Sequence, residues 1–148
     1  MVQLLKRIAQ WMKDNGINQW RYLLSGGDDE EILHAIKKKE TYIVLHEDEV
    51  IATFTISEGQ SEWDQHIFGD DVARDSLYLH RLAISPEWIG KGVGSELLSW
   101  IYQNISTDKS FLKLDCVADN RKLNQFYIDN GFEYMGETDH HSKYQKKL

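Results

Sequence analysis

The sequence predicts a mixed α/β or α+β fold, in which one β-sheet packs against helices. The first half contains helical patterns and then two β-rich runs, TYIVLH and VIATFTIS, with a short polar turn between them. The second half alternates strand and helix patterns up to the tail FEYMGETDHHSKYQKKL. The chain has 148 residues, of which 41% are apolar, and no repeat or linker divides it. We therefore expect a single domain over residues 1–148 with a sizeable core.

Charge and cysteine content narrow the class of protein. The chain has 17 Lys and Arg residues against 24 Asp and Glu, a formal net charge of −7, which argues against nonspecific nucleic-acid binding. Charged residues interrupt the apolar pattern at the N-terminus, so we expect no signal peptide and no membrane segment there. Cys116 is the single cysteine, which excludes an internal disulfide and a zinc site of several thiolates. These features predict a cytoplasmic protein that binds neither nucleic acid nor membranes.

Two helices and a hairpin are expected in the first half. Apolar residues at helical spacing predict a first helix that ends at Asn15-Gly16 and uses Val2, Leu5, Ile8, Ala9 and Met12. A second helix begins at Asp28 or Asp29 and ends near Lys39, with charges that suit the helix dipole. We expect its inward face to consist of Ile32, Leu33 and Ile36. The hairpin turn is predicted at Glu47-Asp48-Glu49.

The second half is expected to contain strand, helix, strand, helix and one or two further strands. The strand SLYLHRLAIS stops at Pro86, and after a glycine-rich loop comes a helix with one apolar face: Val93, Leu97, Leu98, Ile101, Tyr102 and Ile105. The strand FLKLDCVA leads to a helix over about residues 121–130, which Gly131 closes as a left-handed cap. The segment 59–76 shows no period, so we expect a long binding loop or mobile flap.

The loop IGKGVGS is a candidate phosphate site. Gly90, Gly92 and Gly94 lie between a strand and a helix, where free backbone amides and the helix dipole favour an anion. The spacing does not match G-x-G-x-x-G in either register, and Lys91 is followed by Gly92 rather than by Ser or Thr, unlike a Walker P-loop. The alternative is that these glycines only make a flexible turn and allow close packing of the helix.

The order of these motifs closely resembles the GNAT superfamily of acyl-CoA-dependent N-acyltransferases. The resemblance covers about Leu77–Phe132, from the strand LYLHRLAIS through the glycine loop to LNQFYIDNGF. It implies a mixed central sheet flanked by helices, with a splayed strand pair that binds acetyl-CoA or coenzyme A. The family loop pattern, (Gln/Arg)-x-x-Gly-x-(Gly/Ala), is matched at Gly92 and Gly94, whereas Ile89 replaces the Gln or Arg.

The resemblance also assigns residues to the coenzyme. It implies that the strand before the loop hydrogen-bonds the pantetheine arm and that the loop amides hold the pyrophosphate. The coenzyme-binding residues expected on this basis are Leu82, Ala83, Ile84, Ile89, Gly90, Lys91, Gly92, Val93, Gly94, Ser95, Asn120 and Tyr127. Several of these residues also have an alternative role without the coenzyme. Leu82 to Ile84 fit the core side of a strand, and Lys91 fits a solvated loop lysine. Asn120 fits the N-cap of the helix that follows it.

Catalytic roles follow from the same resemblance. Tyr127 matches the tyrosine that protonates the departing thiolate of coenzyme A, although its spacing by itself is typical of a core aromatic. Asp115 and His80 are the two candidates for the general base; His80 alternates onto one strand face with Tyr78, Leu82 and Ile84. His46 and His140-His141 do not converge on an ion, so no metal is expected.

The function expected is transfer of an acetyl group from acetyl-CoA to a primary amine by direct attack. No covalent enzyme intermediate is needed, and Cys116 is interpreted as core. The alternative is a noncatalytic acyl-CoA-binding regulator or interaction module on the same fold. The acceptor is a small-molecule or peptide amine, and a homodimer is left open. The segment 59–76 favours a cationic amine through its carboxylates: Glu62, Asp64, Asp70, Asp71 and Asp75. Trp63 and Phe68 of this segment, with Trp20 from the earlier loop, are expected to line an apolar wall for the carbon chain of the amine. The alternative is that these carboxylates only keep an exposed loop soluble.

Overall fold

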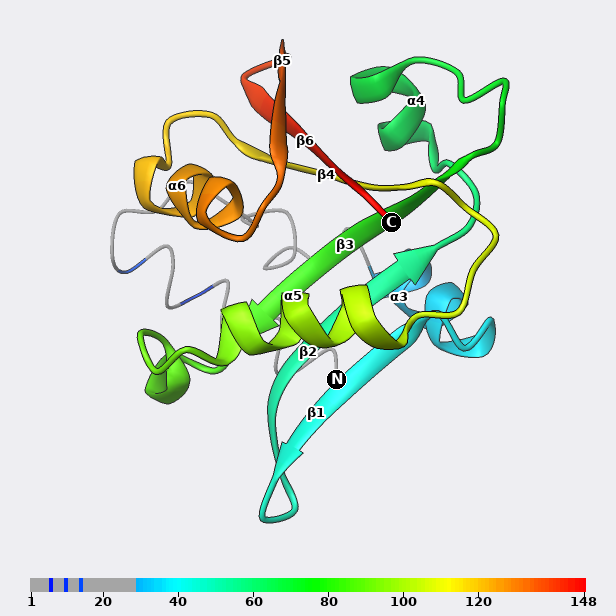
Figure 1. Cartoon of the computed structure of the whole chain (residues 1–148). Coiled ribbons are helices and arrows are strands. Elements are labelled where there is room, and N and C mark those ends of the chain that lie inside the picture. The colour runs from blue at the N-terminus through cyan, green and yellow to red at the C-terminus, as the bar shows by residue number, and fades with distance from the viewer. Residues whose placement is uncertain (1–5, 7–9, 11–13, 15–28) are drawn as a thin grey trace. The chain divides into compact units, whose positions relative to one another are not determined.

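A computed structural model describes residues 6, 10, 14 and 29–148 of the chain (Figure 1). Lys6, Gln10 and Asp14 have helical backbone, and Gln10 Nε2 donates to Asp14 Oδ1 at 2.8 Å. The rest of the helix expected around residues 2–12, and Trp20 of the expected apolar wall, lie outside the described residues.

The described strands form a mixed six-stranded sheet in the order β1-β2-β3-β4-β6-β5. The pairs β1–β2, β4–β6 and β5–β6 are antiparallel, and β3–β4 is parallel. Together with the helices this confirms the predicted mixed α/β class. The elements are α3 (Asp29–Lys37), β1 (Thr41–His46), β2 (Glu49–Ser57), α4 (Glu62–Phe68), β3 (Ser76–Ile84), the 3₁₀ turn η1 (Pro86–Trp88), α5 (Val93–Asn104), β4 (Phe111–Val117), α6 (Arg121–Asp129), β5 (Glu133–Thr138) and β6 (His141–Lys147).

The described residues group into two compact units. The first contains described residues up to Thr55 together with Arg81–Gly94, and the second contains Ile56–His80 and Ser95–Leu148. Each unit is therefore assembled from separate stretches of chain, and β2 and β3 pass from one unit into the other. The expected single domain over residues 1–148 stays a prediction.

In the first unit, α3 buries a narrower face than predicted. Ile32 and Ala35 are buried, whereas Leu33 is 51% and Ile36 is 39% exposed. The prediction for Ile32 is confirmed and the predictions for Leu33 and Ile36 are wrong, because the buried stripe runs along the i, i+3 row and not along the wider apolar face of the sequence.

The hairpin of β1 and β2 has a shorter turn than predicted. Glu47 and Asp48 have φ values of 48° and 68°, and Glu49 already pairs with His46. Two central residues with positive φ are typical of a type I′ turn, whose twist matches that of the strands. The hairpin is confirmed, with a turn of Glu47-Asp48 alone.

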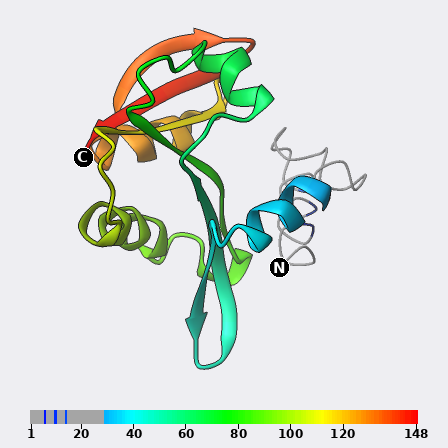
Figure 2. The same ribbon diagram turned by 90° about the vertical axis from the view of Figure 1, so that its right-hand side faces the viewer.

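In the second unit, β4 lies between β3 and β6, and β5 forms the edge. Leu112, Leu114 and Cys116 alternate into the core, as the strand pattern predicts. Figure 2 shows β5 and β6 running side by side, and they make the two-strand version of the predicted tail. The turn between β5 and β6 also contains two residues with positive φ, 49° at Asp139 and 61° at His140.

Helix α6 begins and ends as its sequence predicts. Asn120 Oδ1 accepts from Leu123 N at 3.1 Å, which caps the N-terminus. At the other end Gly131 has φ 87°, its N–H donates to Ile128 O, and Phe132 N donates to Tyr127 O. This pair of bonds is a Schellman motif and confirms the left-handed glycine cap.

Helix α5 buries Leu97, Leu98 and Ile101, which confirms the centre of its predicted apolar face. Tyr102 is 49% exposed, so its assignment to that face is wrong. Its ring instead lies 4.5 Å from Lys146 Nζ, a cation–π contact that keeps the aromatic at the surface.

The segment 59–76 is not the uniform loop that its sequence predicts. It contains α4, which Ser61 caps: Asp64 N donates to Ser61 Oγ at 3.1 Å, and Ser61 N donates to Asp64 Oδ2 at 3.0 Å. This capping box satisfies amides that a helix start leaves free. A helix of seven residues is too short to give a clear period in sequence.

Candidate active site

The glycine loop holds two residues in the left-handed region directly before α5. Gly90 has φ 80° and Gly92 has φ 83°, and a Cβ placed on either one would meet no atom within 4 Å. The loop is thus open on the side where a side chain would stand. The first amides of a helix have no partner inside the helix, so an anion is favoured at this helix start. Gly94 lies inside the first turn of α5 and is buried.

The other expected loop residues divide between exposed and packed positions. Ile89 is 44% exposed and its N–H donates to Pro86 O, while Val93 is half-buried. Lys91 Nζ lies 5.1 Å from the ring centroid of Trp88, so a cation–π contact holds the lysine beside the loop. Ser95 is exposed in the first turn of α5.

The strand before the loop departs from regular alternation. Arg81 has φ 51°, a conformation that breaks the extended backbone in the middle of β3. The expectation that Leu82 and Ile84 share a strand face with Tyr78 and His80 stays a prediction. Ala83 is buried, and the flanking Leu82 and Ile84 are half-buried.

Pairing between β3 and β4 is short. The register runs from Ser76–Phe111 through Leu77–Leu112 to Tyr78–Lys113 and stops there. Within the second unit, β3 continues to His80 without a β4 partner. The pairing therefore ends four residues before Leu82, and the splayed strand pair that the resemblance implies around Leu82–Ile84 stays a prediction.

Tyr127 is buried, with only 6% of its surface exposed, in a cluster of aromatic rings. The centroids of Phe126, Phe132 and Tyr144 lie 5.2, 5.7 and 5.8 Å from its own. Burial raises the pKa of Tyr127 above its ordinary value, and Cys116 and Asp115 raise it further. None of the hydrogen bonds among the described residues uses its hydroxyl. The core position is observed, and the catalytic role stays a prediction.

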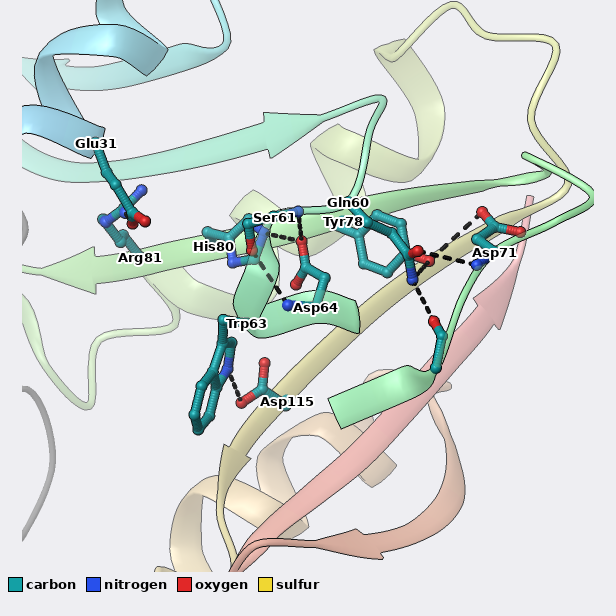
Figure 3. A network of polar contacts seen from close by, with 11 residues as sticks. Glu31, Gln60, Ser61, Trp63, Asp64, Asp71, Tyr78, His80, Arg81 and Asp115 are labelled. Carbon is teal, nitrogen blue, oxygen red and sulfur yellow. Dashed lines mark hydrogen bonds and ion pairs between the residues drawn. The ribbon is translucent and has the colours of Figure 1, made fainter. Parts of the chain in front are cut away.

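Asp115 is held by two neighbours. Its Oδ2 accepts from Trp63 Nε1 at 3.0 Å (Figure 3). The same oxygen lies 3.0 Å from His141 Nδ1, an ion-pairing distance without hydrogen-bond geometry. Sequence reasoning missed both neighbours. Trp63 lies 52 positions away, and His141 reaches β4 only through the β4–β6 register, so no local signal could have found them.

His80 is paired with a buried carboxylate, as Figure 3 shows. Its Nε2 lies 3.0 Å from Asp64 Oδ2, and the two side chains are 19% and 1% exposed. The expectation that Asp64 is a surface charge is wrong, because the capping box and His80 hold it inside. The pattern Ser61-x-x-Asp64 was the readable signal for its place in a helix.

A third polar cluster, formed by Gln60, Asp71 and Tyr78, links the two ends of the segment 60–71. Tyr78 Oη accepts from Gln60 Nε2 at 3.0 Å and donates to Asp71 Oδ2 at 3.4 Å, while Asp71 N donates to Gln60 Oε1. Burial raises the pKa of Tyr78 above its ordinary value, and the charge of Asp71 adds to the shift. Asp71 is therefore an internal partner as well as a contributor to the surface charge.

Potential metal ligands stay apart in the described part of the chain. In residues 6, 10, 14 and 29–148, no three His, Cys, Asp or Glu side chains gather as metal ligands. The centroids of the His46 and Trp88 rings lie 4.6 Å apart.

Within the described residues, no helix has both the length and the apolar character needed to span a bilayer.

Comparison with known proteins gives consistent matches. A family model described as an acetyltransferase (GNAT) domain matches residues 37–134. An uncharacterized N-acetyltransferase of Bacillus subtilis, YesJ, is 40% identical over 134 residues, which is 90% of this chain and 74% of that protein. The crystal structure of a GNAT-family acetyltransferase from Listeria monocytogenes is 30% identical with a TM-score of 0.83, covering 99% of this chain and 86% of the other. The fold also matches PaiA N-acetyltransferase from Thermoplasma acidophilum in complex with coenzyme A, at 17% identity and a TM-score of 0.75, covering 99% and 90% of the two chains.

Proposed function

Because this chain belongs to the GNAT acetyltransferase family, we propose that it transfers an acetyl group from acetyl-CoA to the nitrogen of a primary amine by direct attack. The thioester supplies an activated acyl group, so the protein has to bind, orient and move protons. Holding the two reactants in line removes much of the entropic barrier to their reaction.

The conformation of Gly90 and Gly92 in front of α5 carries this proposal. Their positive φ values and the open space at each Cβ position fit a backbone cradle for the pyrophosphate of the coenzyme. PaiA, which shares the fold, was crystallised in complex with coenzyme A, and this supports a coenzyme site on this fold. Ile89 brings no polar side chain to the loop, so the amides would do the binding.

Tyr127 is the proposed proton donor to the leaving sulfur. As the amine nitrogen attacks the carbonyl carbon, the new C–N bond forms and the C–S bond breaks, leaving its electron pair on sulfur. The phenol then gives its proton to that sulfur, and the proton lost by the amine passes to a base. A phenol carries its proton at neutral pH, and the raised pKa of Tyr127 means that it gives up this proton only when the breaking C–S bond leaves an electron pair on sulfur.

The acceptor proposed is a cationic amine, either a small molecule or an exposed amino group of a peptide. Glu62 and Asp70 are exposed on the segment 60–71, and the net charge of the chain is −7. Negative surface potential raises the encounter rate of a cation, and salt weakens the effect. Asp64 no longer contributes to this argument, because it is buried.

A coenzyme-dependent screen of amines tests the proposal. Acetyl-CoA binding is measured by calorimetry, and transfer is measured as free-thiol release over a blank without amine. The single thiol of the chain, Cys116, is buried, so it adds little to the thiol signal of the folded protein. Release with one class of amine supports the proposal. Tight acetyl-CoA binding with no release for any amine identifies the chain as the noncatalytic acyl-CoA-binding module, and no binding at all contradicts both.

A further inference from the structure

We propose that Asp64 is a positioning residue that holds His80 in the form of a general base, an inference that rests on the proposed acetyl transfer. Both residues belong to the second unit, as do Tyr127 and Asp115. Nothing in the capping of α4 requires His80, and His80 is separated from Asp64 by 16 positions in the chain.

The burial of Asp64 is more than its capping role needs. A capping box needs one carboxylate oxygen to accept the N-cap amide, and it works at a solvated helix start. Here the side chain is 1% exposed, Oδ2 accepts from Ser61 N and lies 3.0 Å from His80 Nε2, and Oδ1 is buried without a hydrogen-bond partner. A buried carboxylate is unfavourable unless it is paired. His80 is the side chain that provides the pairing.

The contact selects one tautomer of the imidazole. An ionised carboxylate only accepts hydrogen bonds, so the nitrogen that faces it, Nε2, carries the hydrogen. The lone pair of neutral His80 is then on Nδ1, which takes part in none of the hydrogen bonds of the described residues. The His80 side chain keeps 19% of its surface exposed, so the imidazole is not fully enclosed by the fold.

The two other carboxylate–histidine contacts of the second unit lack these features. His141 Nδ1 lies 3.0 Å from Asp115 Oδ2 without hydrogen-bond geometry, so that carboxylate does not fix the hydrogen of the His141 ring. His66 and Asp139 are 56% and 55% exposed, and water competes for their hydrogen bonds. The pair Asp64 and His80 combines a buried acceptor with a partly exposed imidazole, the arrangement in which a carboxylate orients a base.

His80 gains and returns one proton in each cycle. The ammonium of the acceptor gives one proton to Nδ1 of His80, and the nitrogen keeps the electron pair that attacks the carbonyl carbon. After the attack the nitrogen loses a second proton, which replaces the proton that Tyr127 gives to the leaving sulfur. The imidazolium then has hydrogens on both nitrogens, and its Nε2–H remains on Asp64. The proton on Nδ1 leaves to solvent after acetyl transfer, so the histidine returns to its starting form.

The test uses Asp64→Asn, His80→Gln and the double variant. Because Oδ2 of Asp64 also accepts from Ser61 N, the side-chain oxygen of Asp64→Asn takes that place, and the variant removes the negative charge that orients His80 and stabilises its protonated ring. We expect kcat to fall by about 10²-fold, within the usual range for acid–base catalysis, with KM for acetyl-CoA unchanged. In the His80→Gln background, Asp64→Asn should cause no further loss, because both changes remove the same function.

Two controls and one spectroscopic readout separate positioning from structure. Ser61→Ala removes the Oγ contact of the same capping box and keeps the His80 contact, and Asp139→Asn breaks an exposed aspartate–histidine pair next to the same helix. Both should retain wild-type kcat. Nitrogen NMR of ¹⁵N-labelled wild-type protein should show His80 with its hydrogen on Nε2, a measurement that needs no variant and no substrate.

A hydrogen on Nδ1 of His80 in the wild-type protein would overturn the proposal, whether or not the protein is an active transferase. So would full turnover by Asp64→Asn, or an equal loss from that change with and without His80. If no amine is acetylated but His80 carries its hydrogen on Nε2, the proposed transferase function fails while the positioning of His80 by Asp64 stands.

Discussion

Tyr144 Oη donates a hydrogen bond of 2.7 Å to Asn124 Oδ1, and this contact joins β6 to α6. The amide nitrogen of Asn124 in turn donates to Val117 O at 3.1 Å and to Asn120 O at 2.8 Å. The side chain of Asn124 therefore connects the end of β4, the start of α6 and the middle of β6 through hydrogen bonds. The same helix carries Tyr127, so this contact positions the proposed proton donor.

Asn124→Ala should destabilise the fold strongly. The change removes several hydrogen bonds and leaves the buried hydroxyl of Tyr144 without its acceptor, so we expect a loss of about 2–4 kcal/mol in the free energy of unfolding. Urea unfolding followed by circular dichroism measures it. Tyr144→Phe should lose less, and Gln125→Ala, which alters an exposed contact with Asp129, should stay near wild type. Equal stability of Asn124→Ala and Gln125→Ala would contradict the role of Asn124.

Gly92→Val should weaken acetyl-CoA binding. At φ 83° a side chain is in the left-handed region, which costs about 1–2 kcal/mol for an L-residue, and the branched chain would stand where the pyrophosphate approaches. We expect binding to fall by about tenfold or more, as measured by calorimetry. Gly59→Ala is the matched control, because Gly59 also has open space at its Cβ position but no positive φ. Unchanged affinity in a folded Gly92→Val protein would place the coenzyme elsewhere.

Tyr127→Phe should lower turnover without loss of the fold. The ring contacts with Phe126, Phe132 and Tyr144 remain, and only the hydroxyl is removed. We expect kcat to fall by about 10²–10⁴-fold with little change in acetyl-CoA affinity. Tyr102→Phe serves as the control, since that tyrosine is exposed. Full activity of Tyr127→Phe would restrict Tyr127 to packing.

Stability should fall as the pH rises above 9, and Cys116 should account for the first part of the loss. Burial raises the pKa of the Cys116 thiol from its ordinary value of 9.0 to about 12, and the charge of Asp115 adds to the shift. Below pH 9 the thiol is protonated in both states, so its contribution is fully present. Between pH 9 and 12 the unfolded chain ionises while the folded one does not, so unfolding becomes more favourable.

Guanidinium unfolding at pH 8, 9 and 10 measures this effect. Wild type should lose about 1 kcal/mol more than Cys116→Ala between pH 9 and 10, because only wild type has a thiol to ionise. Above pH 10 the raised pKa values of Tyr127 and Tyr144 add losses that both proteins share. Parallel stability curves for the two proteins from pH 8 to 10 would contradict the raised pKa of Cys116.

Residues whose structure depends on near neighbours in the chain were predictable. The helix that Asn120 begins and Gly131 ends follows from a cap residue and a glycine at the correct spacing. The place of the glycine loop between a strand and a helix, and the burial of Cys116 in an alternating strand, follow in the same way. In each case the physical cause lies within a few residues, so the sequence pattern contains it.

The contacts of the proposed base and of Asp115 depend on residues far apart in the chain. Asp64 meets His80 across 16 positions and Trp63 meets Asp115 across 52. Charge counting placed Asp64 at the surface, because composition cannot show which carboxylate a fold encloses. The sequence by itself determined the fold class, the loop and the aromatic position of Tyr127. Tertiary structure alone decided which carboxylate is buried beside which histidine, since that pairing depends on how α4 packs and on where β3 stops pairing with β4.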